Sequence, residues 1–578
     1  MKKIDSTMLK KIIQLFKPLR KKIILLLVCI TLSSFLSLIT PMLNRKLIDS
    51  GLLAKNSDVV IRYAAYNIVI IILMQGISIL ETKYRSYLEN IVIFQLEKDA
   101  INHLLHMKLS FFNDVNYVQT VENIKTDIQR ISSLCNTNTF YMVTGVLRII
   151  VGTVGLLAIN WKLSIMIFII IPIYYLLVIL LSRKRINYCK IYMQLDERYS
   201  AWKGDTFAGI REVKNWCMER IKMRQFIKQQ RAIIGQDIKL AYLENANQIV
   251  ETVFQEGLKM LMYIGGVFFI INGSLTIGEL FAFVIYSDYV ISPLFSILDI
   301  PYIFAGIIPS AKRYFEFLER ESEITAGKKV HIKEKKVNGE IRFCNVDFGY
   351  SKEKTLLKNI NFTIKPGEKI GIIGENGSGK STIVNLIMRF LEPDSGYILL
   401  DGININQIDL SEYRSFMAIV SQEIYLFHCS IRENIMLSSR ESEERFKSVV
   451  EKCGINKFVC KLSKQYESSV GERGSRFSGG ERQKIAMARA MMRDAKILIL
   501  DEATANYDVK SEQEINEVIS KDYNDKTIII ITHKPEILKK MNKIVVMDHG
   551  KIADIGKYKE LYGRNMFCRK MVENYIHK

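Results

Sequence analysis

The sequence predicts a multi-domain membrane protein, in which an all-α region with six membrane-spanning helices is followed by an α/β domain built around a phosphate-binding loop. Nearly all long apolar runs of the 578-residue chain fall before residue 305. After residue 340, short β-branched runs end in glycine-rich turns, as in KIGIIGENGSGKST, which is typical of strands that alternate with helices. We therefore expect a membrane domain over residues 1–309, a charged linker over 310–339 and the α/β domain over 340–578.

The first membrane span is predicted at residues 23–43, which carry no charge over 21 positions. About 20 helical residues are enough to cross the hydrocarbon core of a bilayer. The run is too long for a signal peptide and no small-residue cleavage site follows it, so we expect a retained span. The segment before it intersperses apolar residues among lysines, as expected of a helix that lies in the membrane interface.

Five further apolar runs predict the remaining spans, at residues 63–80, 141–159, 163–181, 250–271 and 280–298. The N-terminal segment and the two long connections contain 28 lysines and arginines, and the other three connections contain 5. Because basic residues favour the cytoplasmic side, we expect a multi-pass protein of the cytoplasmic membrane with both termini and the α/β domain in the cytoplasm. Residues 81–112 are rich in helix formers and lack proline, which predicts that the second span continues as a helix beyond the membrane.

The run GENGSGKST at residues 374–382 fits the phosphate-loop pattern. Gly374, Gly379, Lys380 and Ser381 stand at the required spacing between a predicted strand and a predicted helix. Glycines let backbone N–H groups surround phosphates, Lys380 places a cation at the β and γ phosphates, and the Ser381 hydroxyl is a candidate Mg²⁺ ligand. The motif predicts nucleotide binding.

An apolar strand, ILIL, ends at Asp501 and Glu502. In that position Asp501 is placed to hold Mg²⁺, directly or through water, and Glu502 to polarise an attacking water. The simpler alternative is a buried strand followed by an acidic helix cap. The phosphate loop earlier in the chain favours the catalytic interpretation.

A second candidate phosphate contact is the Ser-Gly-Gly at residues 478–480, ahead of a helix predicted over 481–492. The N–H groups and the dipole at the start of a helix suit an anion. Since Lys380 already serves the γ-phosphate in this domain, a second contact is useful if it serves the nucleotide of another copy. We therefore expect two domains, arranged head to tail, to sandwich two ATP molecules.

These motifs, in this order, resemble the ATP-binding cassette (ABC) family, and in particular half-size exporters with six spans fused ahead of one cassette. The resemblance covers nearly the whole chain. It implies an ATP hydrolase coupled to transport, with ATP and Mg²⁺ as cofactors and alternating access as the mechanism. The implied partners are a second half-transporter, identical or related, and membrane lipid.

The resemblance also implies roles for individual residues of the cassette. The implied catalytic groups are Glu502, His533, Lys380 and Gln422. The implied metal ligands are Ser381, Gln422 and Asp501. The residues implied to contact the nucleotide are Tyr350, Gly374, Asn376, Gly377, Ser378, Gly379, Lys380, Ser381, Thr382, Gln422, Ser478, Gly479, Gly480, Glu481, Asp501, Asp508 and His533. Among them, Tyr350 corresponds to the aromatic residue that stacks on adenine.

Two departures from the family pattern occur in the cassette. Glu481 stands where glutamine is usual, and ANYD at residues 505–508 stands where SALD is usual. Neither removes a catalytic group. Both leave open whether the two composite sites are equivalent and whether the partner is a second, related chain.

In the membrane half, the resemblance is carried by LSFFND (109–114), GIREVKNW (209–216) and GSLTIGELFAF (273–283). The first two fall in the long cytoplasmic connections, where such exporters have short coupling helices that rest on the cassettes. The alternative is that their aromatic residues are ordinary packing residues.

Charge and cysteine content argue against some classes of function and leave others open. The formal net charge of +21 does not indicate a nucleic-acid partner, because the basic residues lie largely on the predicted inner side of the membrane, where anionic lipid accounts for them. None of the nine cysteines belongs to a C-x-x-C pair, so we expect free thiols. Three classes of function remain: an exporter or flippase, an importer that shares the exporter fold, and a membrane ATPase that regulates without moving a substrate.

Charged residues occur inside the predicted spans. Arg148 and Asp288 each lie about 11 residues from the outer end of a span, near the middle of the membrane. A charge at that depth costs at least about 2.5 kcal/mol on insertion scales and usually faces a bundle interior or a wet cavity. The two residues are able to pair with each other, as Glu256 and Lys259 are within the fifth span. Alternatively, Arg148 and Asp288 line the path of an amphipathic cargo such as a lipid, a hydrophobic peptide or a drug.

Overall fold

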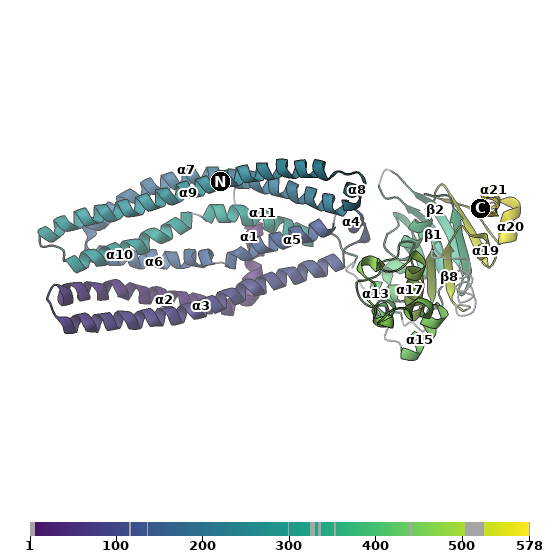
Figure 1. Cartoon of the computed structure of the whole chain (residues 1–578), viewed down its shortest axis with the longest axis horizontal. Coiled ribbons are helices and arrows are strands. Elements are labelled where there is room, and N and C mark those ends of the chain that lie inside the picture. The colour runs from purple at the N-terminus through teal and green to yellow at the C-terminus, as the bar shows by residue number, and fades with distance from the viewer. Residues whose placement is uncertain are drawn as a thin grey trace. The chain divides into compact units, whose positions relative to one another are not determined.

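The computed structural model describes residues 6–114, 117–135, 137–298, 300–323, 330–332, 337–351, 354–437, 442–502 and 525–576. The chain divides into two compact units, one of Met1–Met107 with Phe111–Ser322 and one of Lys108–Ser110 with Glu323–Lys578. The first unit is helical, and the second combines helices with two sheets (Figure 1). The predicted fold class, a helical membrane region followed by an α/β domain, is confirmed.

The helices of the first unit follow the predicted order. They are α1 (Ser6–Phe16), α2 (Arg20–Lys46), α3 (Ser57–Leu105), α4 (Leu109–Asp114), α5 (Tyr117–Ser132), α6 (Thr137–Ile159), α7 (Trp161–Ala208), α8 (Ile210–Asn215), α9 (Glu219–Ile271), α10 (Ile277–Leu298) and α11 (Ile300–Leu318). The six predicted spans fall on α2, α3, α6, α7, α9 and α10. Helices α2 and α3 run side by side, as do α7 and α9 (Figure 1). Helix α3 is continuous over 49 residues, so the second predicted span does continue as a helix past residue 80, and that helix ends at Leu105 rather than at residue 112.

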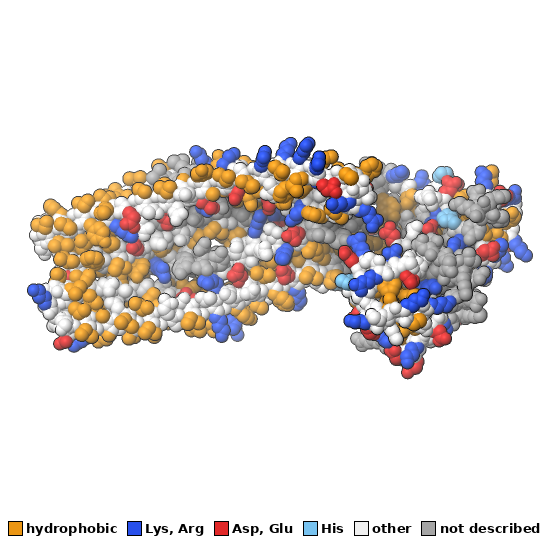
Figure 2. Space-filling model, viewed as in Figure 1, with side chains coloured by type: hydrophobic (Ala, Val, Ile, Leu, Met, Phe, Trp, Pro, Cys, Tyr) orange, Lys and Arg blue, Asp and Glu red, His pale blue; other side chains and the backbone are white. Residues whose placement is uncertain are grey.

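Among the residues that the structure describes, four helical segments are long and apolar enough to cross a membrane: Lys10–Leu52, Ser57–Leu105, Glu219–Ile271 and Ile277–Leu294. Within the described residues, Thr144–Ile159 of α6 and Trp161–Ile173 of α7 form shorter apolar stretches. Figure 2 shows hydrophobic side chains over much of the visible surface of these helices, and Ile72, Ile169 and Phe268 are among the exposed ones. A water-soluble protein rarely exposes apolar patches of this size, whereas lipid tails match them.

The short turn between α6 and α7 is fixed by an asparagine cap. The Asn160 side chain accepts hydrogen bonds from the backbone N–H groups of Lys162 and Leu163 at 3.1 and 3.2 Å. These bonds satisfy donors that the first turn of a helix leaves without partners. The side chain of Asn56 caps α3 in the same way. A capped start of this kind lets the chain reverse within very few residues.

Helices α6 and α10 pack closely through glycine. A Cβ at Gly152 would lie 2.9 Å from Val290 Cγ2, and one at Gly145 would lie 2.7 Å from Pro293 Cβ. Small residues let the backbones of membrane helices approach closely. The two helices therefore form one tightly packed pair.

The second unit contains two sheets. The strands are β1 (Ile341–Phe348), β2 (Leu357–Ile364), β3 (Lys369–Gly374), β4 (Ser395–Leu400), β5 (Ile403–Asn404), β6 (Met417–Val420), β7 (Ile497–Asp501), β8 (Thr527–Ile531), β9 (Lys543–Asp548) and β10 (Lys551–Gly556). One sheet has the antiparallel order β2-β1-β4-β5, and the other has the order β10-β9-β3-β8-β7-β6. In the larger sheet β9, β3, β8, β7 and β6 are parallel, so their carboxyl ends share one edge. Ligands of open α/β sheets bind at this edge.

Helices cover the second unit around two apolar cores. They are α12 (Lys380–Ile387), α13 (Leu410–Ser415), α14 (Ile431–Met436), α15 (Glu443–Lys452), α16 (Asn456–Val459), α17 (Gly479–Met492), α19 (Pro535–Leu538), α20 (Tyr558–Arg564) and α21 (Met566–Ile576). Alternate residues of β7 separate the cores: Leu498 and Leu500 belong to the one that includes α17, and Ile497 and Ile499 to the one that includes α12. The sheet is therefore buried on both faces, and its carboxyl edge carries the polar groups.

Candidate functional site

The phosphate loop lies between β3, which ends at Gly374, and α12, which begins at Lys380. Gly377 has a φ of +81°, a conformation that residues with a Cβ rarely adopt. A Cβ at Gly374 would lie 2.4 Å from the Met547 carbonyl oxygen, whereas one at Gly377 would meet no atom within 4 Å. The loop is thus held against the sheet at its start and open at Gly377, where there is room for phosphate oxygens.

The ammonium group of Lys380 closes the loop. Its Nζ donates to the carbonyl oxygens of Gly374 at 2.8 Å and Glu375 at 2.9 Å. An ammonium has three donors, so a third N–H is left to meet an anion. Burial lowers the pKa of Lys380, and the negative charges of Glu502 and Asp501 oppose that effect. The negative charge of a phosphate bound at the loop would stabilise the charged form of the buried Lys380 side chain.

Ser378 supplies an independent test of whether the loop fits a polyphosphate. Its side chain is 3% exposed, and its Oγ has no hydrogen-bond partner among the described residues. A buried hydroxyl without a partner costs about 1–3 kcal/mol. A phosphate oxygen at the loop would accept this hydrogen bond. Asn376 and Ser381 are exposed on the same loop, whereas Thr382 is buried.

The acidic residues predicted for catalysis stand at the carboxyl edge of the sheet. Asp501 is the last residue of β7, and the backbone N–H of Glu502 donates to the Ile531 carbonyl of β8 at 3.0 Å. Glu502 has a φ of +48°, an uncommon conformation that costs about 1–3 kcal/mol in a residue other than glycine. Gln422 Nε2 donates to Glu502 Oε2 at 2.8 Å, and His533 Nε2 lies 3.6 Å from Glu502 Oε1. The fold therefore brings Gln422, Glu502 and His533 together.

Burial shifts the pKa values of Asp501 and His533. The pKa of Asp501 is raised by burial and by the charge of Glu502, while Lys380 and a hydrogen bond with Ser381 lower it. The pKa of His533 is lowered by burial and by Lys380, against the opposing charge of Glu502. His533 is therefore neutral at neutral pH, with one donor and one acceptor nitrogen. A neutral imidazole next to Glu502 is able to bond a water or a phosphate oxygen.

The donor atoms near the phosphate loop suit Mg²⁺. The Ser381 hydroxyl lies close enough to the Asp501 carboxylate to lower its pKa, and Gln422 follows β6, the strand next to β7. Hard oxygen donors of this kind are what Mg²⁺ prefers, and it usually takes its other ligands from phosphates and water. Within the described residues no group of three or more His, Cys, Asp or Glu side chains forms a metal site of its own. The residues present fit a Mg²⁺ ion that arrives with a nucleotide.

Tyr350 is placed for stacking. Its side chain is 66% exposed, and its hydroxyl oxygen lies 3.4 Å from Thr382 Oγ1 at the start of α12. The ring packs edge-on against Phe348, with centroids 5.1 Å apart. The arrangement leaves the ring exposed close to the phosphate loop, where a flat base is able to stack on it.

The Ser-Gly-Gly segment forms a helix start. Helix α17 begins at Gly479, two residues earlier than the predicted start at Glu481, and Ser478 is its N-cap. Within the part of the chain that the structure describes, no hydrogen bond or ion pair joins residues 478–481 to the phosphate loop. The two predicted phosphate contacts are thus not joined within one copy. Asp508 and the ANYD segment lie outside the described residues.

Arg489 is a functional candidate that was not predicted from the sequence. Its guanidinium group donates to Asn434 O at 2.9 Å, to Asn434 Oδ1 at 3.0 Å and to the Tyr425 carbonyl at 3.1 Å. These bonds fix the segment that follows Gln422. An arginine on the buried side of a helix is the sequence signal that indicates such a role, because a buried charge needs partners.

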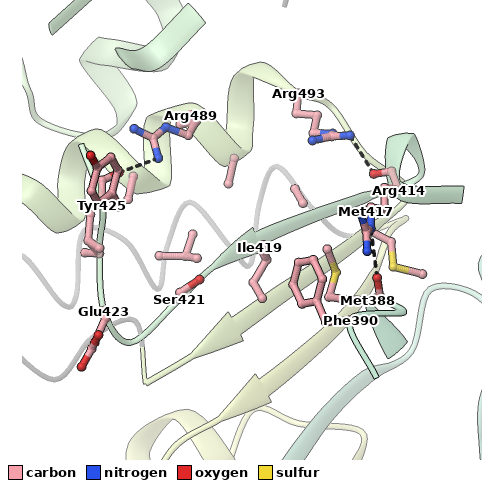
Figure 3. A pocket seen from close by; sticks show the side chains of 15 residues that line it. Met388, Phe390, Arg414, Met417, Ile419, Ser421, Glu423, Tyr425, Arg489 and Arg493 are labelled. Atoms are coloured by element: carbon pink, nitrogen blue, oxygen red, sulfur yellow. Dashed lines mark hydrogen bonds between the residues drawn. The ribbon is translucent and has the colours of Figure 1, made fainter. Parts of the chain in front are cut away.

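A cavity of about 370 Å³ lies beside this arginine (Figure 3). Figure 3 shows Arg489 reaching to Tyr425, and Arg493 donating to the Arg414 carbonyl at 2.7 Å. The other lining residues are Met388, Phe390, Met417, Ala418, Ile419, Val420, Ser421, Glu423, Ile424, Ala486 and Ala490. Because Ser421 and Glu423 flank Gln422, a group that enters this cavity would touch the segment that carries Gln422.

Four polar side chains, Gln255, Glu256 and Lys259 of α9 and Asp288 of α10, form a cluster between these two helices. Asp288 accepts a hydrogen bond from Gln255 Nε2 at 3.1 Å and lies 3.9 Å from Lys259 Nζ. Lys259 also pairs with Glu256 at 3.0 Å, as the sequence allowed. Asp288 is therefore connected to the fifth predicted span, a contact that the sequence analysis did not anticipate when it considered a pair with Arg148.

Comparisons with known proteins cover both units. A family model described as ABC transporter transmembrane region matches residues 23–294, and one described as ABC transporter matches residues 357–505. The ATP-dependent lipid A-core flippase of Haemophilus ducreyi is 27% identical over 584 residues, covering 98% of each chain. The protein of the same name from Mannheimia succiniciproducens is 27% identical over 537 residues, covering 90% of each chain.

The chain is also similar to a eukaryotic relative and to a solved structure. ABC transporter B family member 1 of Dictyostelium discoideum is 28% identical over 573 residues, which cover 96% of this chain and 62% of the relative. The structure of a bacterial Atm1-family ABC exporter with ATP bound has a TM-score of 0.85 at 22% identity, over 96% of this chain and 98% of that one. At this level of identity the structural match establishes the fold.

Proposed function

The chain belongs to the ABC transporter family, with the architecture of a half-size exporter, and on that premise we propose that it uses ATP hydrolysis to export or flip an amphipathic substrate across the cytoplasmic membrane as a dimer. The observation that carries the proposal is the meeting of Gln422, Glu502 and His533 beside the phosphate loop. This catalytic edge belongs to a chain whose other unit consists of membrane-length helices. ATP hydrolysis and membrane passage are thereby combined in one polypeptide.

The cassette residues divide the chemistry among them. Lys380 and the N–H groups of the phosphate loop hold the phosphates, and Tyr350 stacks on the base. Mg²⁺ held by Ser381, Asp501 and Gln422 would supply charge neutralisation at the phosphates. Glu502 orients and polarises the attacking water, while neutral His533 bonds the water or the γ-phosphate from the other side of the carboxylate. The assignment of these roles is supported by the distances and by the pKa direction of His533.

A dimer is required because one copy holds only half of each nucleotide site. Residues 478–481 head α17 with N–H groups suited to an anion, yet they make no described contact with the phosphate loop of their own copy. Two copies arranged head to tail would place each Ser478 on the nucleotide of the other. Nucleotide-driven closure then turns the helical units outward, since only the closed state has both contacts.

The proposal also covers the orientation of the chain in the membrane and the limits of its domains. We place the termini, the long helical connections and the second unit in the cytoplasm, from the distribution of lysine and arginine. Residues 1–309, 310–339 and 340–578 remain our limits for the membrane domain, the linker and the nucleotide-binding domain. Helices α4 and α8 are our candidates for the coupling elements, and the exposed Trp216 and Ile210 at α8 offer apolar contacts.

The proposed substrate class is amphipathic: a lipid, a hydrophobic peptide or a drug taken from the inner leaflet or the cytoplasm. Two features support it. The helical unit carries polar groups, among them Asp288, Gln255 and Lys259, between otherwise apolar helices. The relatives of about 27% identity are named as flippases of lipid A-core. We propose that Arg148 and Asp288 line the path.

Transport assays in liposomes test the proposal. The purified chain is reconstituted, ATP is added outside, and movement of a fluorescent phospholipid and of an amphipathic dye is followed. We expect ATP-dependent movement toward the side opposite the nucleotide units, absent with Glu502→Gln. ATP-dependent movement toward the nucleotide units would indicate an importer with this fold. Hydrolysis without movement of any lipid, peptide or dye would indicate a regulatory ATPase.

A further inference from the structure

Ser478 and Glu481 bond to each other at the start of α17. The backbone N–H of Ser478 donates to Glu481 Oε2 at 2.8 Å, and the backbone N–H of Glu481 donates to Ser478 Oγ at 3.3 Å. In addition, the Ser478 hydroxyl donates to the same Glu481 Oε2 at 2.8 Å. Glu481 therefore caps the helix and also accepts a hydrogen bond from the serine hydroxyl.

This use of the hydroxyl conflicts with phosphate binding. A serine hydroxyl has one hydrogen to donate. A γ-phosphate that is fully ionised offers acceptors only, so Ser478 must release Glu481 before it can donate to the phosphate. The bond that must break is charge-assisted, and such hydrogen bonds are about twice as strong as neutral ones.

The charge of Glu481 acts in the same direction. Its carboxylate shares a first helical turn with the N–H groups that are suited to an anion. A negative side chain at this position cancels part of the favourable dipole for an incoming phosphate and repels it directly. Both effects oppose the contact between Ser478 and the nucleotide of a second copy.

We propose that Glu481 is a positioning residue that holds Ser478 in an autoinhibited contact and thereby raises the ATP concentration at which two copies close. The proposal rests on the proposed function, because it concerns the regulation of that composite site. A glutamine at this position keeps a neutral oxygen to accept from the Ser478 N–H, so the helix cap survives. The NH₂ group of the glutamine adds a hydrogen-bond donor at a position where the carboxylate would repel the phosphate. Glu481→Gln therefore isolates the charge from the cap.

The chain contains a matched control. Ser430 and Glu433 form the same capping box at the start of α14, with Ser430 N donating to Glu433 Oε2 at 2.8 Å and Glu433 N donating to Ser430 Oγ at 3.1 Å. Ser430 is 8% exposed, whereas Ser478 lies in the exposed class. Glu433→Gln thus makes the same chemical change to a cap that is closed to ligands.

The experiment measures ATP hydrolysis by the full-length protein in lipid nanodiscs as a function of ATP concentration, for the wild type, Glu481→Gln and Glu433→Gln. The difference between a charged and a neutral hydrogen bond predicts that Glu481→Gln lowers the half-maximal ATP concentration about fivefold or more. Glu433→Gln should leave this concentration unchanged. Raising the salt concentration should narrow the gap between the wild type and Glu481→Gln, since salt screens exposed charges.

An unchanged half-maximal ATP concentration in Glu481→Gln, while the wild type hydrolyses ATP and Ser478→Arg does not, would overturn the role of Glu481 and leave the proposed function standing. Equal shifts in Glu481→Gln and Glu433→Gln would reduce the effect to helix capping and would also overturn it. A wild type that does not hydrolyse ATP would overturn the proposed function together with this inference.

Discussion

Gln422 donates a hydrogen bond of 2.8 Å to Glu502, across 80 residues of sequence, and so ties the segment after β6 to the residue that follows β7. The same segment continues past Ser421 and Glu423, which line the cavity beside Arg489. We therefore expect a displacement at the cavity to reach, through this hydrogen bond, the group that we propose as the catalytic carboxylate.

The first prediction concerns Glu502→Gln. The amide keeps an oxygen that accepts from Gln422, so the local structure should persist, but it cannot act as a base. General-base catalysis contributes about 100-fold to 10,000-fold in rate, and we expect turnover to fall by an amount in this range. Nucleotide binding should be retained, measured with a fluorescent ATP analogue. Glu536→Gln, an exposed acid in α19, is the control, and near-normal turnover in Glu502→Gln would remove the carboxylate from its assigned role.

The second prediction separates binding from chemistry with Lys380→Ala. Loss of the ammonium removes a charge-assisted contact to phosphate that is worth about 1.5–3 kcal/mol, so the Kd for ATP should rise about tenfold to 100-fold. Lys369→Ala, at the opposite end of β3, should leave the Kd unchanged. The Kd is measured by isothermal titration calorimetry, with both variants made in the Glu502→Gln background because that substitution prevents turnover during the measurement. An unaltered Kd in Lys380→Ala would mean that the loop does not hold the phosphates.

Some features of this site follow from the sequence, and others depend on packing. The phosphate loop and the strand that ends at Asp501 are local patterns, and their elements were predicted. The start of α17 was placed two residues too late because Gly479 and Gly480 are poor helix formers, whereas the hydrogen bonds of the Ser478 cap over-ride that preference. The contact of Gln422 with Glu502 depends on β6 and β7 being neighbours in the sheet, an order that spacing along the chain does not specify.

The same distinction applies in the helical unit. The six apolar runs predicted the helices, because about 20 predominantly apolar residues are enough for a helix to cross a membrane. The partners of Asp288 are set by how α9 and α10 pack, and these are Gln255 and Lys259. Arg489 was missed because its role comes from carbonyl groups of two distant segments.

The third prediction concerns coupling through Trp216→Ala. Trp216 is 75% exposed, and its Nε1 donates to Glu212 Oε2 at 3.1 Å, so removal of the ring should not unfold the chain. We expect basal hydrolysis to stay within about twofold, because surface substitutions have small effects on stability, while stimulation by substrate is lost. Trp161→Ala, a similarly exposed tryptophan at the turn between α6 and α7, is the control. Full stimulation in Trp216→Ala would exclude α8 as a coupling element.

The fourth prediction addresses the substrate path. In Asp288→Asn the amide still accepts from Gln255, and Lys259 keeps its pair with Glu256, so the fold should be retained. We expect a selective loss of stimulation by cationic amphipaths, and Arg148→Gln should lose stimulation by anionic ones. The measurement is substrate-stimulated ATPase in liposomes across cationic, anionic and zwitterionic compounds. Unchanged profiles in both well-folded variants would mean that these charges are structural.

The head-to-tail sandwich is tested most directly by mixed dimers of Ser478→Arg and Lys380→Ala. Each variant alone impairs both composite sites of a homodimer. Ser478→Arg obstructs the nucleotide of the opposing copy, and Lys380→Ala weakens nucleotide binding. A mixed dimer, isolated with two different affinity tags, contains one intact site, formed by the phosphate loop of the Ser478→Arg copy and the Ser478 of the Lys380→Ala copy. We predict that Ser478→Arg alone does not hydrolyse ATP, that Lys380→Ala alone hydrolyses it only at raised ATP concentrations, and that the mixed dimer recovers activity from that one site. Full activity of Ser478→Arg by itself, or an inactive mixed dimer, would contradict the account.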